Sequence, residues 1–234
     1  VQTCALPIYF TTANTLFVNP AIGWDGAGAG TFASPYKTIN AAVAAAAPGT
    51  TIRLAVGYYP ENVNIVNKSN LKIVGAGLYA SIINPPSKDA FFVYQSSNIV
   101  FDKMWLLSPG TDGRGILALA ASVETYLIRT NGTRWLGIEA VGQNGWVSTL
   151  TARYSRFDGI QTIAGVYLED AANANLYGIS ASGIGFATDY TGYCSGLVVN
   201  KSSTAYVDQS TFYHNRDDGV MATGTSRLEM VNSY

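Results

Sequence analysis

Hydrophobic and polar residues alternate along this chain in a register that returns about every 26 residues. Residues 69–74 (SNLKIV) align without a gap with residues 97–102 (SNIVFD). Similar segments begin at anchors placed at Ala121, Ser148, Ala174, Ser203 and Ser226. The second residue after each anchor is apolar, and the fourth is apolar or small. Alternation with period two predicts strands that bury one face, and a repeat of this length predicts a solenoid.

A second repeated feature is a glycine followed by an aliphatic residue. Such a pair follows five successive anchors by 16 to 22 residues, at Gly115, Gly137, Gly165, Gly196 and Gly219. Each repeat therefore turns and begins another strand, and none has the length or pattern for a helix. Strands repeated in one direction predict the stacked coils of a parallel β-helix, with about 4.8 Å between coils.

One helix is predicted before the coils, over residues 35–47. Ser34 and Pro35 supply the preferred residues for a helix start, and the Pro48-Gly49 pair stops the helix. Residues 39, 42, 43 and 46 form one apolar stripe. We expect this helix to cover the open first coil, which divides the chain into a strand and capping helix at 9–50 and coils at 51–234.

Both ends of the chain are unusual. Residues 1–8 (VQTCALPI) read like the translation of a sequencing adapter, so they are excluded from the interpretation of the fold. The last repeat, residues 226–234, lacks the core aromatic residue and second strand of earlier repeats. We therefore expect an incomplete terminal coil, truncated at the C-terminus, with an exposed edge that allows self-association.

Residues 15–77 carry a resemblance to known proteins. The segments LFVNP (16–20), SPYKTIN (34–40), PGTTIRL (48–54), GYYPEN (57–62) and LKIVGAG (71–77) resemble the N-terminal part of bacterial right-handed parallel β-helix proteins of the pectate-lyase-like superfamily. The resemblance implies an all-β fold, a right-handed single-stranded parallel β-helix with an N-terminal α-helical cap. The superfamily includes lyases, hydrolases, epimerases, phage tailspikes and non-catalytic surface proteins, so the resemblance implies no single reaction.

Composition excludes several other functions. Only 12% of the 234 residues are charged, with 14 Lys and Arg against 15 Asp and Glu, and no basic run suggests nucleic-acid binding. No apolar run reaches the ~18 residues of a membrane span. With His214 as the sole histidine, and Cys194 the sole cysteine outside residues 1–8, a His or Cys zinc site has too few ligands.

The first candidate site lies on the predicted outer face of the anchored strands. Asp102 and Glu124 fall on neighbouring coils, and Arg153 lies on the next. Acids beside an arginine resemble pectate lyases, in which calcium binds the substrate carboxylate and an arginine removes a proton. The resemblance implies Asp102 and Glu124 as calcium ligands and Arg153 as the base. The alternative is a surface ion pair between Glu124 and Arg153.

The second candidate site is the segment YHNRDDG at 213–219. Its Asp217, Asp218 and His214 could serve acid–base hydrolysis, in which two carboxyl groups flank the scissile bond. The alternative is a turn, because Asn and Asp bond their own backbone and Gly219 precedes the next strand.

Aromatic residues near the coil corners complete the candidates, because sugar rings stack on exposed aromatic faces. These residues are Trp105, Tyr126, Trp135, Trp146 and Tyr213. The sequence therefore predicts an extracellular or cell-surface domain that acts on or binds a polysaccharide, with a lyase or hydrolase reaction on an acidic glycan. The alternative is a non-catalytic surface or adhesin-type scaffold.

Overall fold

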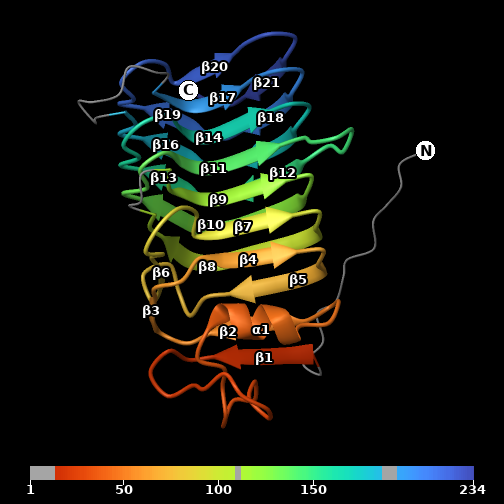
Figure 1. The fold of residues 1–234 in the computed structure, drawn as a ribbon. Helices are drawn as coiled ribbons and strands as arrows, with labels where there is room; N and C mark the ends of the chain where they lie inside the picture. Colours follow the sequence, from red (N-terminus) through yellow and green to blue (C-terminus); the bar gives the residue numbers. More distant parts are fainter. Residues whose placement is uncertain (1–13, 109–111, 186–193) are drawn as a thin grey trace.

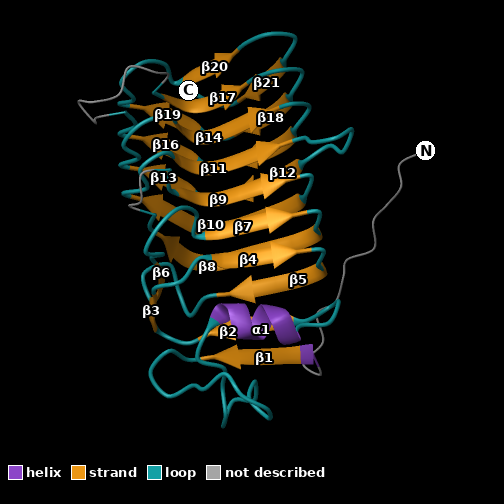
Figure 2. Ribbon diagram, viewed as in Figure 1, coloured by secondary structure: helices purple, strands orange, loops and turns teal. Residues whose placement is uncertain are grey.

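The structure is a computed structural model that describes residues 14–108, 112–185 and 194–234. Stacked coils of parallel strands form a rod, with the chain winding from one end to the other (Figure 1). Figure 2 shows strands and turns along this rod and a short helix near the N-terminal end. The prediction of a parallel β-helix is therefore confirmed, with about seven turns. No helix among the described residues is long and apolar enough to cross a membrane.

Each coil contributes strands to three faces, which we name A, B and C. Face A contains β1 (Thr15–Val18), β2 (Thr51–Leu54), β5 (Ser69–Val74), β8 (Ser97–Leu106), β10 (Ser122–Asn131), β12 (Thr149–Arg153), β15 (Asn173–Tyr177), β18 (Thr204–Asp208) and β21 (Arg227–Val231). Face B contains β3 (Gly57–Tyr59), β6 (Ser81–Ile83), β13 (Arg156–Asp158), β16 (Ser180–Ser182), β19 (Thr211–Tyr213) and the C-terminal parts of β8 and β10. Face C contains β4 (Val63–Val66), β7 (Phe91–Tyr94), β9 (Arg114–Leu119), β11 (Leu136–Val141), β14 (Ala164–Glu169), β17 (Ser195–Val199) and β20 (Val220–Ala222).

The anchored register is confirmed for most coils of face A. Val123 pairs with both Ile99 and Leu150, and all three side chains are buried. One coil differs, because Ala174 pairs with Leu150 and is the second residue after an anchor at Ala172. The predicted anchor at Ala174 was therefore wrong by two residues. A shift of two keeps every side chain on its predicted face, so alternation cannot reveal it.

The glycine positions on face C are explained by close stacking. A Cβ atom on Gly137 would lie 2.3 Å from the carbonyl oxygen of Gly165 and 2.8 Å from the Phe157 ring. Gly165 is equally tight against the carbonyl oxygen of Gly196, at 2.7 Å. Phe157 itself is fully buried. The glycines thus let the backbone of face C lie close to the core aromatics. They also fix the position of the neighbouring residues along the axis of the rod.

The helix is shorter than predicted. α1 (Ile39–Ala45) begins after Thr38, whose hydroxyl accepts a hydrogen bond from the Ala41 backbone at 3.1 Å. The predicted start at Ser34-Pro35 was wrong, because Tyr36 instead forms a bridge with Val18 of β1. The Glu61 carboxylate also accepts hydrogen bonds from the first helical backbone amides, at 2.7 and 3.0 Å.

The apolar stripe of α1 is buried as predicted. Ile39, Ala42 and Val43 join the same core cluster as the interior of the coils. The helix packs against β1, β2 and β4, the first strand of face C. It therefore takes the place that a further strand of face C would occupy, at the lower end of the rod in Figure 1.

The other end of the rod is formed by β20 and β21. β21 pairs with β18 in the expected register, and the Tyr234 backbone bonds to Ser210 and Phe212 of the coil below. Residues 227–234 therefore continue the stack rather than fold over it. Met230, at the core-facing position, remains 38% exposed. Residues 1–8 lie outside the described part of the chain.

Candidate functional site

A cluster of charged side chains lies on face C, where three successive coils meet. Asp89 precedes β7, Arg114 begins β9, and Glu139 lies in β11. The pairing of Phe91 with Ile116 places Asp89 and Arg114 at equivalent positions of neighbouring coils. On the next coil Leu136 pairs with Arg114, and Glu139 lies three residues after Leu136. We call these three residues the carboxylate–arginine cluster.

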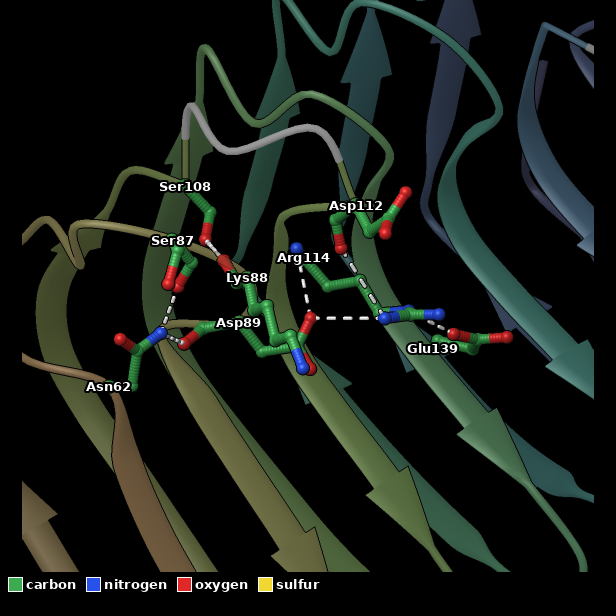
Figure 3. Close-up of polar contacts among 8 residues, drawn as sticks. All are labelled: Asn62, Ser87, Lys88, Asp89, Ser108, Asp112, Arg114 and Glu139. Atoms are coloured by element: carbon green, nitrogen blue, oxygen red, sulfur yellow. Dashed lines mark hydrogen bonds and ion pairs between the residues drawn. The ribbon is translucent and has the colours of Figure 1, made fainter.

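Arg114 bridges the two carboxylates (Figure 3). Its Nη1 donates to Asp89 Oδ1 at 3.2 Å, and its Nε donates to Glu139 Oε2. Its backbone amide also donates to Asp89 Oδ1 at 3.2 Å. All three side chains are mostly buried, with 11–18% of their surface exposed. One guanidinium thus faces two carboxylates in a poorly solvated position.

The surroundings hold this cluster in place. The guanidinium lies 5.0 Å from the ring centre of Trp135, a cation–π distance. Asn62 donates to the Asp89 carbonyl oxygen at 2.9 Å and also to that of Ser87. These residues, together with Lys88, line an open groove of about 660 Å³. The groove is also lined by Val63, Asn64, Phe92, Asp112 and Leu117.

The electrostatics of the cluster favour proton transfer. Burial raises the pKa of Asp89 above its ordinary value, and Arg114 offsets only part of that effect. Burial likewise raises the pKa of Glu139, again against the influence of Arg114. Burial alone would lower the pKa of Arg114, but the charges of Glu139 and Asp89 outweigh it and raise that pKa. The cluster therefore combines an arginine with two carboxyl groups, Asp89 and Glu139, whose pKa values all lie above their ordinary ones.

Asp89 and Arg114 line the groove, and Glu139 contacts Arg114 from the next coil. Two carboxyl groups with raised pKa values at this place are suited to acid–base chemistry. Lys88 lines the same groove and forms no ion pair within the described residues. Its ammonium group is therefore available to a carboxylate on a bound molecule. Trp135 and Phe92 add apolar surface at the same place.

The first predicted site is dispersed into separate ion pairs. Glu124 and Arg153 lie on the outer side of face A and pair with each other at 3.5 Å, which is the predicted alternative. Asp102 pairs instead with Lys72 at 3.2 Å and is only 7% exposed. Calcium binds six to eight oxygen atoms, and these two carboxylates are already engaged by cations. No group of three or more His, Cys, Asp or Glu side chains that could hold a metal ion occurs among the described residues, so calcium at Asp102 and Glu124 stays a prediction.

The second predicted site has the form of a turn. The Asp217 carboxylate accepts a hydrogen bond from the Cys194 backbone at 3.0 Å, and the Asp217 amide donates to the Cys194 carbonyl oxygen at 3.2 Å. His214 has a left-handed backbone with φ of 52° and contacts the Tyr213 ring. Asp218 is exposed. No hydrogen bond or ion pair joins His214 to Asp217 or Asp218 within the described residues.

The predicted aromatic residues lie on different faces. Trp135 alone reaches the carboxylate–arginine cluster. Trp105 lies on face B, 5.0 Å from the Arg129 guanidinium. Tyr126 contacts the Tyr154 ring on the other side of the rod, and Tyr213 is exposed beside His214. Trp146 projects from a loop between β11 and β12.

The sequence analysis did not find Asp89, Arg114 or Glu139. The signal was present, because Arg114 immediately precedes a repeated glycine and Glu139 follows the next one by two residues. Aligning the glycines would have placed both on neighbouring coils of one face. The charged residues of the first candidate site were instead chosen from the anchored strands, which form face A.

The sheets and the buried interior define a parallel β-helix fold. No protein-family model matches the chain, and no curated protein sequence matches it. Among solved structures, a pectin methylesterase in complex with a hexasaccharide matches with a TM-score of 0.53 at 12% identity. The match covers 89% of this chain and 66% of that one, so this chain spans less than two thirds of its length.

Two further solved structures match with lower TM-scores. The A-module of the mannuronan C-5 epimerase from Azotobacter vinelandii matches at 14% identity and a TM-score of 0.48, covering 83% of this chain and 70% of that one. A pectin methylesterase from carrot matches at 15% identity and a TM-score of 0.42, covering 94% and 89%. Identities this low establish the fold and leave the reaction to be argued from the site.

Proposed function

We propose that this chain is a polysaccharide-active domain that binds an acidic glycan in the groove on face C. The carboxylate–arginine cluster performs acid–base chemistry there, in a lyase or hydrolase reaction. The observation that carries the proposal is the pair of carboxyl groups with raised pKa values, Asp89 and Glu139, held on one arginine beside the groove. Lys88 supplies the positive charge that a uronate carboxylate requires.

Further support comes from the shape of the fold. The groove runs across coils that repeat every 4.8 Å or so, which suits a linear polymer with a repeating unit. The proposal includes the right-handed winding predicted from the sequence, which parallel crossovers adopt in about 98% of proteins. It also includes an extracellular or cell-surface location, where such polymers are found.

The test is a panel of uronate-containing glycans, with neutral glycans as the comparison. New reducing ends, new unsaturated ends and released methanol report hydrolysis of the chain, elimination and ester hydrolysis, respectively. We expect one of these products from an acidic glycan. Products from neutral glycans alone, or none from any glycan, would contradict the proposal. A complete lack of glycan binding would favour the non-catalytic scaffold.

Two substitutions connect the activity to the cluster. Asp89→Asn and Glu139→Gln each remove one of two carboxylates and leave Arg114 with a single partner, so the variants should fold. We expect each to reduce turnover by roughly 100-fold or more, the usual contribution of a general acid or base. Glu124→Gln is the matched control, because it removes a carboxylate from the exposed pair on face A. Equal loss in all three variants would show that the cluster is not the catalytic site.

A further inference from the structure

The connection from β11 to β12 is longer than its neighbours and forms a hairpin. Residues 142–148 connect these strands, whereas residues 120 and 121 suffice between β9 and β10. Figure 1 shows this connection in green, projecting beyond the other turns along that corner of the rod. The stack of coils does not need the additional residues, so the hairpin calls for another explanation.

The hairpin is rigid at its tip. Asn144 and Gly145 have left-handed backbones with φ of 53° and 80°, the pattern of a tight two-residue turn. The backbones of Gln143 and Trp146 exchange two hydrogen bonds, each 2.9 Å long. Trp146 therefore follows directly after a fixed turn, and its position is determined before any ligand binds.

Trp146 is 68% exposed at this position. Its side chain borders two hollows, one of about 490 Å³ towards the preceding coils and one of about 340 Å³ towards the following coil. A large aromatic side chain held in water next to two hollows loses the benefit of burial. A ligand that covers the indole would recover it.

The larger hollow has an uncharged lining. Asn67 and Gln95 lie at the same corner of neighbouring coils, both with left-handed backbones, and both side chains are exposed. Neither side chain makes a hydrogen bond within the described residues. The rest of the lining consists of Ser96, Ser97, Ala120, Ala121, Ser122 and Val147. Free amides and hydroxyls beside one indole match the hydroxyls and the C–H face of a sugar ring.

The lining of this hollow contains no charged side chain, unlike that of the groove on face C. It contains no cation that could pair with a carboxylate, a sulfate or a phosphate. An acidic ligand would be disfavoured there, because burying a charge without a partner is unfavourable. Its exposed apolar surface comes mainly from Trp146 and Val147, which is small against the ~800 Å² that each partner contributes to a standard protein interface. A neutral saccharide fits this chemistry better than an acidic one or a protein.

We propose that the hollow beneath Trp146 is a second glycan-binding site, which takes a neutral saccharide segment. The site is independent of the carboxylate–arginine cluster. Trp146 provides the stacking surface, and the side chains of Asn67 and Gln95 provide hydrogen bonds to sugar hydroxyls.

The experiment measures binding of neutral oligosaccharides to the full chain by calorimetry, with oligogalacturonate as the acidic comparison. The neutral probes are oligomers of glucose, mannose, xylose and galactose. We expect at least one of them to bind, and Trp146→Ala to weaken that binding about tenfold, which corresponds to about 1.4 kcal/mol. Trp146→Phe retains a ring and should weaken it less. Asn67→Ala combined with Gln95→Ala should also reduce affinity.

Two controls make the result specific. Tyr206→Ala removes an exposed aromatic residue from face A and should leave neutral-sugar binding unchanged. Asp89→Asn should also leave it unchanged, so the failure of one proposal does not imply the failure of the other. The proposal is overturned if no neutral probe binds, or if Trp146→Ala binds as well as the original chain. It is also overturned if Trp146→Ala abolishes self-association instead, which would identify a protein contact.

Discussion

Replacing Arg114 with Met tests whether the carboxylate–arginine cluster is a buried ionic unit. The substitution keeps most of the aliphatic side chain but leaves Asp89 and Glu139 without their shared cation. Removing one partner of a buried ion pair typically costs about 3–5 kcal/mol of unfolding free energy. For a chain of this size the melting temperature should fall by roughly 6–20 °C.

The loss should depend on pH in a defined direction. Burial already raises the pKa values of Asp89 and Glu139, and removal of Arg114 raises them further. A group whose pKa is higher in the folded state contributes stability at low pH that disappears as the pH rises through that pKa. The Arg114→Met variant should therefore be close to the original chain near pH 4 and much less stable near pH 7.

Urea unfolding followed by circular dichroism at both pH values measures this difference. Arg153→Met is the matched control, because Arg153 and Glu124 form an exposed pair with half or nearly half of each side chain in water. Its loss should be about 0–1 kcal/mol at either pH. The triple variant Asp89→Asn, Arg114→Met, Glu139→Gln should recover most of the stability. A penalty for Arg114→Met that is the same at both pH values would refute the reasoning.

Four further predictions concern the rod and the segment at 213–219. Val43→Asp puts a carboxylate into the core under α1 and should cost about 3–5 kcal/mol in thermal unfolding; an unchanged melt would show that α1 does not close the core. Gly137→Ala should cost about 1–3 kcal/mol, because its Cβ would meet the Gly165 carbonyl oxygen, and denaturant unfolding would measure it. His214→Ala should leave turnover on glycans unchanged, whereas a large loss would return catalysis to that segment. The exposed edge of β21 should promote concentration-dependent association in sedimentation, and a chain that stays monomeric would contradict this.

The fold could be predicted from the sequence because its signal is repeated. Each coil offers an independent copy of the same alternation, and errors in one copy do not affect the rest. The slip at Ala174 shows where this fails: Ala172, Ala174 and Leu176 all point to the same side, so two registers satisfy the pattern equally well. Only the pairing with the neighbouring coils decides between them.

The site could not be predicted in the same way, because it is not repeated. Asp89, Arg114 and Glu139 are single departures from a regular pattern, each on a different coil. Their proximity depends on the register of face C, which the sequence marks only by its glycines. The predicted residues on face A had a clearer register, but the structure pairs Asp102 with Lys72 and Glu124 with Arg153 instead of bringing the three together.

The two proposed sites lie at opposite ends of one strand. Trp135 and the partner position of Arg114 lie at the start of β11, and the Trp146 hairpin follows its end, about 17 Å away for a strand of six residues. The close stacking of Gly137 between Gly115 and Gly165 fixes the position of this strand along the axis of the rod. Successive coils of the rod have nearly the same backbone. A binding or catalytic site therefore requires a coil whose residues depart from the repeat. Here Glu139 of the carboxylate–arginine cluster and the added hairpin both occur on the coil of β11, which makes this coil the best candidate for the functional centre of the rod.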